Sequence, residues 1–282
     1  MQPLTVAVLT VAVLAALAFL AKRQFEALPK KKKKKLFTKT VNDIFGWFED
    51  KGLMRRTPAF DHDYHETYPE LRILEAGYAD VRAECEKLLE IKDRLTDVRS
   101  LGAGYTDGGI HKAKWKAFMF KSGDFIEENC ALAPKTTALL RQIPGMYTAF
   151  FSVLDPHQDI TPHWGYYKGF LRYHLGVIIP ENNANRKCWI RVNGDAEDNA
   201  KREKELVDRG ETYYWKNGEG IIFDDNYLHV AANESDEVRV VLWLDMRRKM
   251  PFYIQWFNRL CLWLVYHDNS VEKIRRGALI TG

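Results

Sequence analysis

TPHWGYYKGFLRYHLGV, Thr161–Val177, places two histidines and an arginine in a run that is otherwise mostly apolar and aromatic. Because successive side chains of a strand point to opposite faces, Arg172 and His174 share one face, and the leucines and the tyrosine around them take the other. An arginine and a histidine inside a small barrel cost free energy to bury unless they meet an anion. The segment is therefore either an ordinary buried strand or the lining of a site for a metal and an acidic small molecule.

The residues around this stretch are typical of short β-strands. From residue 147 onward, runs rich in β-branched and aromatic side chains are separated by turn signals, as in YTAFFSVL, FLRYHLGVII, CWIRV, GIIFDD and VRVVLWLDM. Such strands predict a mainly β fold, with a double-sheet barrel or jelly roll over residues 147–249. Asn217-Gly218 predicts a hairpin turn between two of the strands. The polar segment 194–210 predicts a solvent-facing helical insertion that leaves the site intact.

Helices are expected on the N-terminal side of the barrel. From Leu74 to Lys92, side chains spaced three and four apart predict an amphipathic helix, and PKTTALLRQI (134–143) predicts a second one that begins with a proline. We therefore expect residues 61–146 to form a helical N-terminal part of the catalytic domain. The acids and histidines of DHDYHE (61–66) are typical of a solvated loop rather than of a metal cluster.

Composition favours one catalytic domain in a reducing compartment. With 282 residues, 46% of them hydrophobic, the chain can bury a full core and still carry appendages. The cysteines form no C-x-x-C pair, which argues against a zinc ribbon and against a disulfide framework. They are Cys85, Cys130, Cys188 and Cys261.

Charge is divided unevenly along the chain. The formal net charge is +4, but residues 1–40 hold nine basic groups against one acid and carry +8, which leaves −4 for the rest. The basic balance thus comes from a terminal segment. We therefore expect no nucleic acid partner for the folded domain.

The N-terminus carries the clearest signal for a membrane. The run from Leu4 to Ala21 carries no charge and has about the length that a membrane-spanning helix needs. Residues 1–23 are therefore predicted to be a transmembrane anchor. Basic residues follow this run instead of preceding it, which favours an anchor over a cleaved signal peptide and places the catalytic domain in the cytosol. Residues 24–60 are expected to be a polybasic tether with short helices, in which Lys30 to Lys35 bind anionic headgroups or form a solvated spacer.

Residues 250–282 are expected to form an aromatic, amphipathic tail. The segment MPFYIQWFNRLCLWLVY (250–266) is too short and too interrupted by polar residues to span a membrane. Packing on the core and lying in the membrane interface both remain open for this segment.

The polar residues of the barrel make up the inventory of a nonheme iron site. Two histidines, His163 and His229, fall at strand or loop edges, while Arg172, His174 and Arg239 fall on inward faces. Nonheme iron oxygenases use a few neutral imidazoles for Fe(II), keep open coordination positions, and hold the carboxylates of 2-oxoglutarate with fixed cations. Structural roles are the alternative, because a buried histidine can be a hydrogen-bonded filler and an inward arginine can meet an aspartate. The available aspartates are Asp224, Asp225 and Asp245.

Two longer segments resemble the core signature of the aspartyl/asparaginyl β-hydroxylase family. These are SVLDPHQDITPHWGYYKGFLRYHLGVIIP and GEGIIFDDNYLHVAANESDEVRVVLWLD, within about 100 residues (147–246). The family pattern is Ser…P-H-x-G…L-R-x-H-L-G, then G…F-D-D-x-x-x-H…N…R-v-v-L…D. The resemblance implies a double-stranded β-helix of jelly-roll, cupin-like form. It also implies a dioxygenase that uses Fe(II), 2-oxoglutarate and O₂ to hydroxylate an unactivated C–H bond.

The same resemblance assigns roles residue by residue. It makes His163 and His229 the iron ligands and Arg239 the partner of the distal carboxylate of 2-oxoglutarate. A bidentate arginine–carboxylate pair gives both geometry and affinity. The remaining positions that the resemblance assigns to cosubstrate binding are Ser152, Arg172 and His174.

One departure from the usual metal triad concerns Gly165. The pattern H-x-D/E…H places an acid where this chain has glycine, as peptide-hydroxylating members of the family also do, with water in the vacant position. An aspartate from elsewhere is the other way to complete the iron shell. The candidates are Asp155, Asp159 and Asp225.

The layout and the site indicate different acceptors. The anchor, the segment YPELRILEAGYADVRAECEKLL before the barrel, the aromatic residues after it and the LRYHLG motif resemble the bacterial lipid A acyl-chain hydroxylases. The H-x-G pattern at Gly165 instead resembles the protein-hydroxylating branch. We favour a lipid acyl chain, with Asp or Asn residues of a protein as the alternative. A catalytically inactive module that sits on membranes through its basic tether is a third possibility.

Overall fold

The computed structural model describes residues 29–101, 113–266 and 269–280. The predicted anchor, residues 1–23, lies outside them. Within them, every helix is too short or too polar to cross a membrane. The chain divides into two compact units, Met1–Trp47 and Phe48–Gly282.

The tether contains one long helix where short ones were expected. Helix α2, Lys30–Asp50, has 21 residues and begins at the first lysine of the block, so the block is part of a helix. Lysine favours helices and no proline interrupts the segment, which explains its length. Lys39 and Asp43, one turn apart, form an ion pair of 2.6 Å. Gly52, at φ +67°, lies just beyond the end of the helix.

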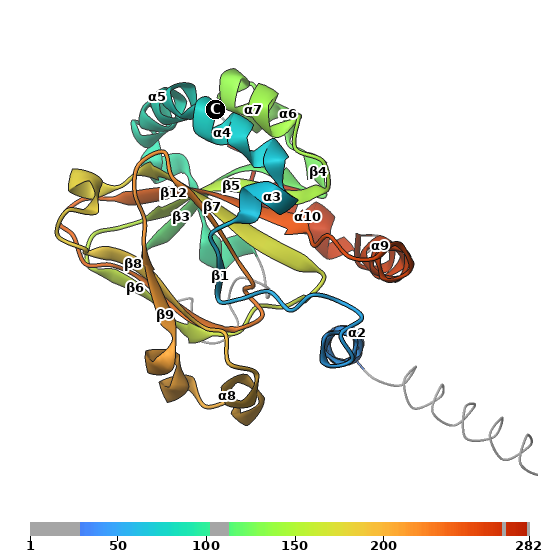
Figure 1. The fold of residues 1–282 in the computed structure, drawn as a ribbon. Helices are drawn as coiled ribbons and strands as arrows, with labels where there is room; N and C mark the ends of the chain where they lie inside the picture. The colour runs from blue at the N-terminus through green and yellow to red at the C-terminus, as the bar shows by residue number, and fades with distance from the viewer. Residues whose placement is uncertain (1–28, 102–112, 267–268, 281–282) are drawn as a thin grey trace, which may run out of the picture. The chain divides into compact units, whose positions relative to one another are not determined.

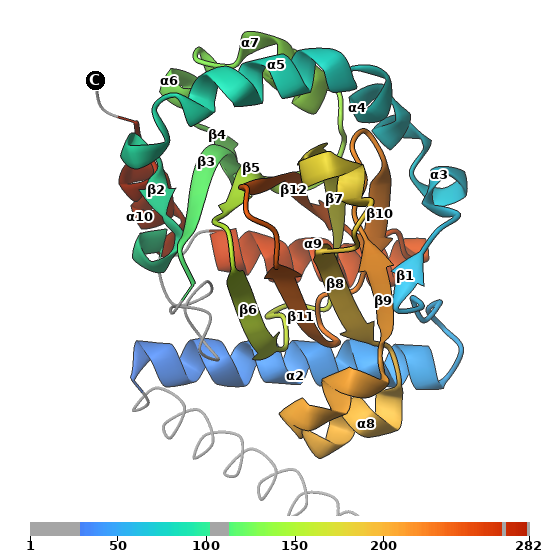
Figure 2. The ribbon, with the colours of Figure 1, turned by 90° about the vertical axis from the view of Figure 1, so that its left-hand side faces the viewer.

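Two antiparallel sheets build the barrel (Figures 1 and 2). Among the described residues, the large sheet has the order β1-β10-β7-β12-β5-β3-β2, with β4 beside β3, and the small sheet has the order β6-β11-β8-β9. Along the chain, the strands from β5 to β12 pass repeatedly from one sheet to the other, which is the jelly-roll arrangement that the sequence predicted. Their bounds are β5 Met146–Leu154, β6 Gln158–His163, β7 Phe170–Ile178, β8 Cys188–Asn193, β9 Glu211–Tyr214, β10 Gly220–Phe223, β11 Leu228–Asn233 and β12 Arg239–Arg247.

The large sheet extends into the part that was expected to be helical. Strands β1 (Phe60–Asp61), β2 (Thr96–Asp97), β3 (Trp115–Ser122) and β4 (Asp124–Phe125) all join it. The segment of β3, WKAFMFKS, is largely buried on both faces and therefore lacks the alternation that marks a strand. The expectation of a solvated loop at 61–66 is wrong in part, because Asp61 is buried in β1 and Tyr64 is buried in α3 (Tyr64–Thr67).

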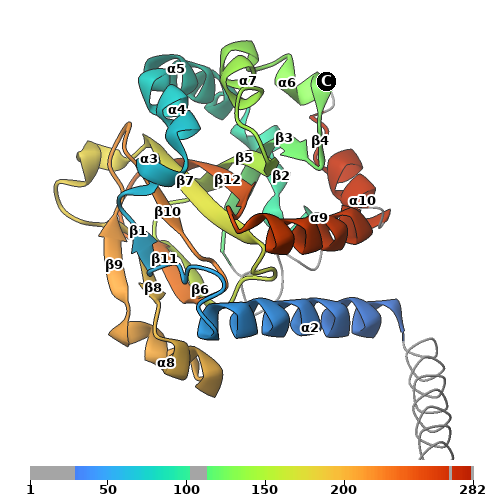
Figure 3. The same ribbon diagram turned by 45° about the vertical axis from the view of Figure 1, so that its right-hand side comes forward.

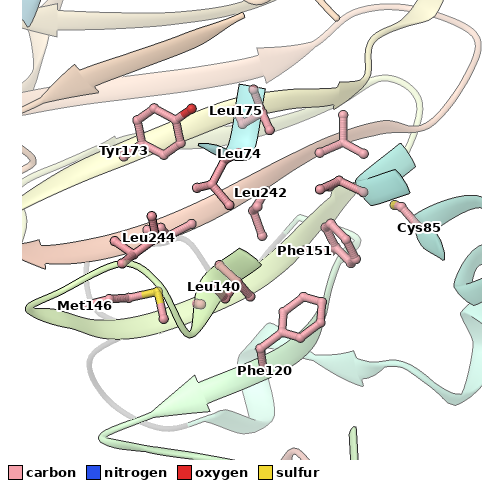
Figure 4. Packing of buried hydrophobic residues seen from close by; sticks show 14 of the residues in the cluster. Leu74, Cys85, Phe120, Leu140, Met146, Phe151, Tyr173, Leu175, Leu242 and Leu244 are labelled. Carbon is pink, nitrogen blue, oxygen red and sulfur yellow. The ribbon is translucent and has the colours of Figure 1, made fainter. Parts of the chain in front are cut away.

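Helices cover the outer face of the large sheet (Figure 1). The helix predicted from Leu74 onward is interrupted at Gly77, which separates two helices. Gly77 packs closely on Leu139, because a Cβ at this position would stand 2.4 Å from Leu139 Cδ1. Figure 4 shows side chains of these helices packed on those of the strands, among them Leu74, Cys85 and Leu140. The helical elements of this part are η1 Pro69–Leu71, α4 Arg72–Ala76, α5 Tyr78–Leu89, η2 Lys92–Arg94, η3 Val98–Leu101, α6 Glu127–Cys130 and α7 Pro134–Leu140.

The segments that connect β7, β8, β9 and β10 agree with the sequence prediction except at one turn. After η6 (Pro180–Asn183) and β8, the polar insertion forms α8 (Ala196–Lys201) and η7 (Lys204–Arg209), as predicted. The predicted hairpin at Asn217-Gly218 is wrong, because β9 belongs to the small sheet and β10 to the large one. Gly218 does turn, at φ +75°, but its amide donates to the carbonyl of Gly176. The turn therefore carries the chain from one sheet to the other.

The C-terminal segment forms two helices outside the two sheets, α9 (Phe252–Tyr266) and α10 (Asn269–Gly277) (Figure 3). Four residues of α9 are buried, namely Ile254, Asn258, Cys261 and Leu262. Among the other described side chains of this helix, Phe257 is half-buried and six large apolar ones are exposed: Phe252, Tyr253, Trp256, Leu260, Trp263 and Leu264. Packing on the core therefore accounts for only one face of α9.

Candidate metal and cosubstrate site

A cavity lies between the two sheets. It is lined by all six residues that the sequence nominated: Ser152, His163, Arg172, His174, His229 and Arg239. Apolar side chains complete its walls: Trp115, Ile160, Ile190, Trp215, Phe223, Ala231 and Trp243. The antiparallel register brings residues from distant parts of the chain to one place, since His163 pairs with His229, and Trp243 with His174.

His163 and His229 face each other with matched hydrogen bonds. Their ring centroids are 4.1 Å apart. Each Nδ1 lies 2.8 Å from the backbone carbonyl two residues earlier, that of Thr161 for His163 and that of Tyr227 for His229. A carbonyl only accepts, so each Nδ1 carries the hydrogen and each Nε2 keeps its lone pair. This is the arrangement in which a histidine is oriented to bind a metal through Nε2.

Burial keeps these two imidazoles neutral. It lowers the pKa of His163 to about 4. It also lowers the pKa of His229 well below its ordinary value, and His163 adds to the effect. Because a metal binds the neutral ring, both histidines are in the required protonation state at neutral pH.

Arg239 is a buried cation without an anion. Its side chain is 1% exposed and its Nε lacks a hydrogen-bond partner. The guanidinium lies 4.5 Å from the ring centroid of Trp215, and no carboxylate in the described part of the chain forms an ion pair with it. Burial lowers its pKa to about 10, so it stays protonated at neutral pH. A bound carboxylate would supply the missing charge.

His174 and Ser152 add unused hydrogen-bonding capacity to the same cavity. Neither ring nitrogen of His174 has a hydrogen-bond partner, and burial lowers its pKa well below the ordinary value. Ser152 Oγ accepts a hydrogen bond of 2.8 Å from Trp115 Nε1, which leaves its own hydroxyl hydrogen for a further acceptor. Orphaned polar atoms in a buried cavity are rare and indicate a ligand.

Arg172, unlike Arg239, already holds two carboxylates. Its Nε is 2.9 Å from Asp245 Oδ1 and its Nη2 is 2.8 Å from Asp225 Oδ2. The guanidinium also stacks 3.7 Å from the ring centroid of Trp243. Of the two inward arginines, only Arg172 therefore takes the structural role that an aspartate partner implies.

Gly165 leaves no room for the acid that the usual triad carries there. A Cβ at this position would stand 2.3 Å from Asp225 Oδ2, and the Gly165 amide donates to the Asp225 carbonyl at 2.6 Å. Burial raises the pKa of Asp225 to about 7, although Arg172 opposes this shift. No group of three histidine, cysteine or acidic side chains with metal-binding geometry occurs in the described residues. The candidate site thus offers two protein nitrogens.

The other candidate acids are engaged or exposed. Asp155 pairs with Lys92 at 2.5 Å, and Asp159 is exposed on β6. Neither lines the cavity.

One residue that supports the site was not found by sequence reasoning. Asn199 Oδ1, in α8, accepts from Trp164 Nε1 at 3.1 Å and from the Leu228 amide at 2.7 Å. Trp164 follows His163 and Leu228 precedes His229, so the insertion ties together the neighbours of both histidines. The polar composition of the insertion gave no signal for this role. The insertion was expected only to leave the site intact, and its contacts add a supporting role.

Known proteins share this chain's sequence pattern. The family model described as aspartyl/asparaginyl beta-hydroxylase matches residues 75–249. An ornithine lipid ester-linked acyl 2-hydroxylase from Rhizobium tropici is 34% identical over 233 residues, covering 78% of this chain and 73% of that protein. Aspartate beta-hydroxylase domain-containing protein 2 of Mus musculus is 29% identical over 67% of this chain, and the match spans 50% of that protein's length.

Solved structures resemble the chain only distantly. A prolyl-4-hydroxylase from Pseudomonas putida has a TM-score of 0.36 at 12% identity, over 61% of this chain and 88% of that one. A likeness at this level supports no statement about function. The family rests on the sequence matches, and by them this chain belongs to the aspartyl/asparaginyl β-hydroxylase family.

Proposed function

We propose that the protein is an Fe(II)- and 2-oxoglutarate-dependent dioxygenase that hydroxylates an unactivated C–H bond. The observation that carries the proposal is a single cavity with two neutral, pre-oriented imidazoles and a buried arginine that lacks an anion. The two nitrogens fit a metal with open positions, and Arg239 fits the carboxylate of a small dicarboxylic acid. When bound, iron and 2-oxoglutarate supply the activation of O₂ and the oxidation of the C–H bond, with succinate and CO₂ as coproducts.

In this proposal the chain's own residues bind, orient and exclude water. His163 and His229 hold the metal through Nε2 because their Nδ1–H groups are fixed on backbone carbonyls. Arg239 pairs with one carboxylate of 2-oxoglutarate, and the Ser152 hydroxyl and His174 bind its polar atoms. Arg172 holds Asp225 and Asp245 in place, so its contribution to cosubstrate binding is through the shape and charge of the wall. The aromatic lining keeps water out and strengthens each charged contact.

For the acceptor, we propose a lipid acyl chain. Two observations support this class. The relative with 34% identity is described as an acyl 2-hydroxylase of an ornithine lipid. In addition, a helix of the catalytic unit exposes large aromatic side chains.

Asp or Asn residues of a protein are the second candidate acceptor. Gly165 favours this class, because its H-x-G pattern resembles that of the protein-hydroxylating branch. Asp225 packs against Gly165 and leaves no room for an acid at the triad position. Relatives described as aspartate beta-hydroxylase domain proteins point the same way.

Succinate formation tests the reaction and its acceptor together. With Fe(II), 2-oxoglutarate and O₂, we expect the full-length protein to form succinate faster when a lipid extract is added. His163→Ala should abolish this stimulation, whereas His62→Ala, at an exposed histidine, should leave it intact. If His163→Ala formed succinate at the wild-type rate, the proposed dioxygenase activity would be refuted. If acidic peptides stimulated the reaction and lipids did not, the acceptor would be a protein instead of a lipid.

We also propose that the catalytic unit faces the cytosol beside the membrane. The support is in the sequence, where basic residues, Lys30 to Lys35 among them, follow an uncharged run. A topology reporter fused after Gly282 should be active only in the cytosol, and activity on the outer side would contradict this placement.

A further inference from the structure

One face of α9 is rich in exposed aromatic side chains. Phe252 is 78% exposed, Trp256 69% and Trp263 57%. Tyr253, Leu260 and Leu264 are also exposed. We call these six residues the aromatic face of α9. Monomeric soluble proteins rarely expose so many large apolar groups together, and such patches mark interaction sites.

Helical spacing explains how α9 both packs and stays exposed. The aromatic face recurs at steps of three and four residues from Phe252 to Leu264, so its members line one side of the helix. Ile254, Asn258, Cys261 and Leu262 occupy the opposite side and are buried. The helix is therefore held by one side only, and its aromatic face points away from the protein.

Positive charge accompanies this face. Residues 252–282, which include both C-terminal helices, hold four arginines and lysines against two acids, a net charge of +2. Since the whole chain carries +4 and residues 1–40 carry +8, residues 41–251 are left with −6. Arg259 on α9 and Lys273 on α10 are exposed. The C-terminal helices thus combine aromatic and basic groups on an otherwise acidic unit.

The buried side of α9 is bonded to the loop that follows His163. Asn258 Oδ1 accepts from Tyr167 Oη at 2.6 Å, and Asn258 Nδ2 donates to the Gly169 carbonyl at 3.1 Å. A Cβ at Gly169 would stand 2.3 Å from Asn258 Oδ1, so the glycine makes room for this contact. The loop, residues 164–169, joins His163 at the end of β6 to the strand that carries Arg172. The buried side of α9 is thus connected, through this loop, to the strands that carry His163 and Arg172.

We propose that the aromatic face of α9 docks onto the surface of an anionic lipid bilayer and holds the catalytic unit there. The inference deepens the proposed function and rests on it, because an acyl chain has to reach the cavity from a bilayer. Tryptophan and tyrosine rings suit the boundary between headgroups and acyl chains, since one end of each ring is polar. Exposed arginine and lysine next to them meet anionic headgroups.

A second copy of the chain is a weaker occupant for this face. Two copies joined through α9 would bring together two C-terminal segments, residues 252–282, that each carry +2. Like charges at an interface oppose association unless they are compensated. An anionic bilayer, in contrast, complements both the aromatic groups and the charge.

A site-specific label on the full-length protein tests the docking. Trp256→Cys and, as the matched control, Leu132→Cys each carry an environment-sensitive fluorophore; Leu132 is 47% exposed and follows α6. The four native cysteines are buried, so they compete little for the label. Both proteins are placed in vesicles of phosphatidylcholine and phosphatidylglycerol in equal parts, with and without a nitroxide on the acyl chains. The nitroxide quenches only fluorophores that contact the bilayer.

We expect the label at residue 256 to be quenched several-fold more than the label at residue 132. Equal quenching at both positions would overturn the proposal. A label at residue 256 that the nitroxide does not quench, because a second copy of the chain covers it, would also overturn the proposal. Because any N-terminal anchor is common to both proteins, it cannot produce a difference between them.

A paired substitution separates this inference from the proposed function. Trp256→Gln combined with Trp263→Gln should raise the KM for lipid extract in these vesicles several-fold, and should leave kcat and the affinity for 2-oxoglutarate unchanged. If the label at residue 256 is quenched but no lipid is hydroxylated, the proposed acceptor is wrong and the proposed docking surface is supported. If lipid is hydroxylated and both labels are quenched equally, the proposed docking surface is wrong and the proposed hydroxylase activity is supported.

Discussion

Single residues of the cavity differ in whether their charges are already compensated. Arg172 has two carboxylates and an aromatic ring, whereas Arg239 has an aromatic ring alone. An uncompensated buried cation is costly in the empty cavity and binds an anion strongly when one enters. Arg239 therefore makes binding of a dicarboxylate and stability of the fold interdependent.

Replacing Arg239 tests this link directly. In wild type, 2-oxoglutarate at about 100 times its Kd should stabilise the protein by about 2.7 kcal/mol, seen as a rise in Tm. Arg239→Met should lose this rise, while its ligand-free Tm stays equal or increases, because an apolar side chain removes an unpaired buried charge. Arg191→Met, at an arginine paired with Asp208 at 2.9 Å, is the control and should keep the rise. An equal rise in Arg239→Met would show that the cosubstrate binds elsewhere.

Asn199 is expected to set the geometry of the two histidines. Asn199→Ala removes two hydrogen bonds to the neighbours of His163 and His229, which costs about 1–3 kcal/mol of stability. Anaerobic titration should also show Fe(II) affinity lower by about tenfold. The control, Asn185→Ala, loses bonds to the Glu181 carboxylate and the Lys187 amide, neither of which neighbours the two histidines. Wild-type Fe(II) affinity in Asn199→Ala would mean that the insertion has no influence on the ligands.

Gly165 is expected to be intolerant of any side chain. Gly165→Ala places a methyl group within 2.5 Å of both the carboxylate and the backbone carbonyl of Asp225. Forced contacts of this kind cost about 1–3 kcal/mol, to be measured by urea denaturation. Gly277→Ala, where a Cβ has nothing within 4 Å, should not destabilise the protein. A stable Gly165→Ala variant would indicate that Asp225 moves readily.

Among the elements, α9 is linked to the site through one buried amide. Asn258 is fully buried and bonds to Tyr167 and Gly169 in the loop that follows His163. Its amide accepts from the Tyr167 hydroxyl and donates to the Gly169 carbonyl. The position of the helix and the conformation of the loop are thus coupled.

Removing this amide should loosen both elements. Asn258→Ala removes the hydrogen bonds that join this helix to the Tyr167 hydroxyl and to the Gly169 carbonyl, at a cost of about 1–3 kcal/mol. Hydrogen exchange should become faster in residues 252–266 and 164–169 together. Leu260→Ala, at an exposed position of the same helix, should change neither segment. Faster exchange confined to α9 would contradict the coupling.

For the molecule as a whole, burial of neutral histidines predicts sensitivity to acid. Burial lowers the pKa of His163, His174 and His229, so the unfolded chain takes up protons below about pH 6.5 that the folded protein refuses. The free energy of unfolding therefore falls as pH falls from that value, by up to about 1.4 kcal/mol per pH unit for each histidine. Above it, these residues contribute no pH dependence.

Urea denaturation between about pH 7 and pH 5 measures this slope. His174→Gln should flatten it, since one of the three groups is removed. His157→Gln, at an exposed histidine paired with Asp236, serves as the control. The same slope in His174→Gln as in wild type would show that His174 does not contribute to the acid sensitivity.

The sequence by itself determined strands β5, β7, β8, β10 and β12, the two-sheet fold and the inner face of β7. It could do so because a period of two fixes which side chains share a face, whatever the partner strand is. Charged groups in apolar strands stand out, and together with the family resemblance, which added Ser152, they nominated all six polar residues that line the cavity. The helix at Pro134 followed from a local signal in the same way.

Only the tertiary structure decided what these residues contact. Arg172 and Arg239 look alike in sequence, yet one lies against two aspartates and the other against none in the described residues. The partners of Asn199, and the passage of the Asn217-Gly218 turn between sheets, likewise depend on residues far away along the chain. Local patterns encode the direction of a side chain, but pairing between distant segments is set by packing and register, which no short stretch contains.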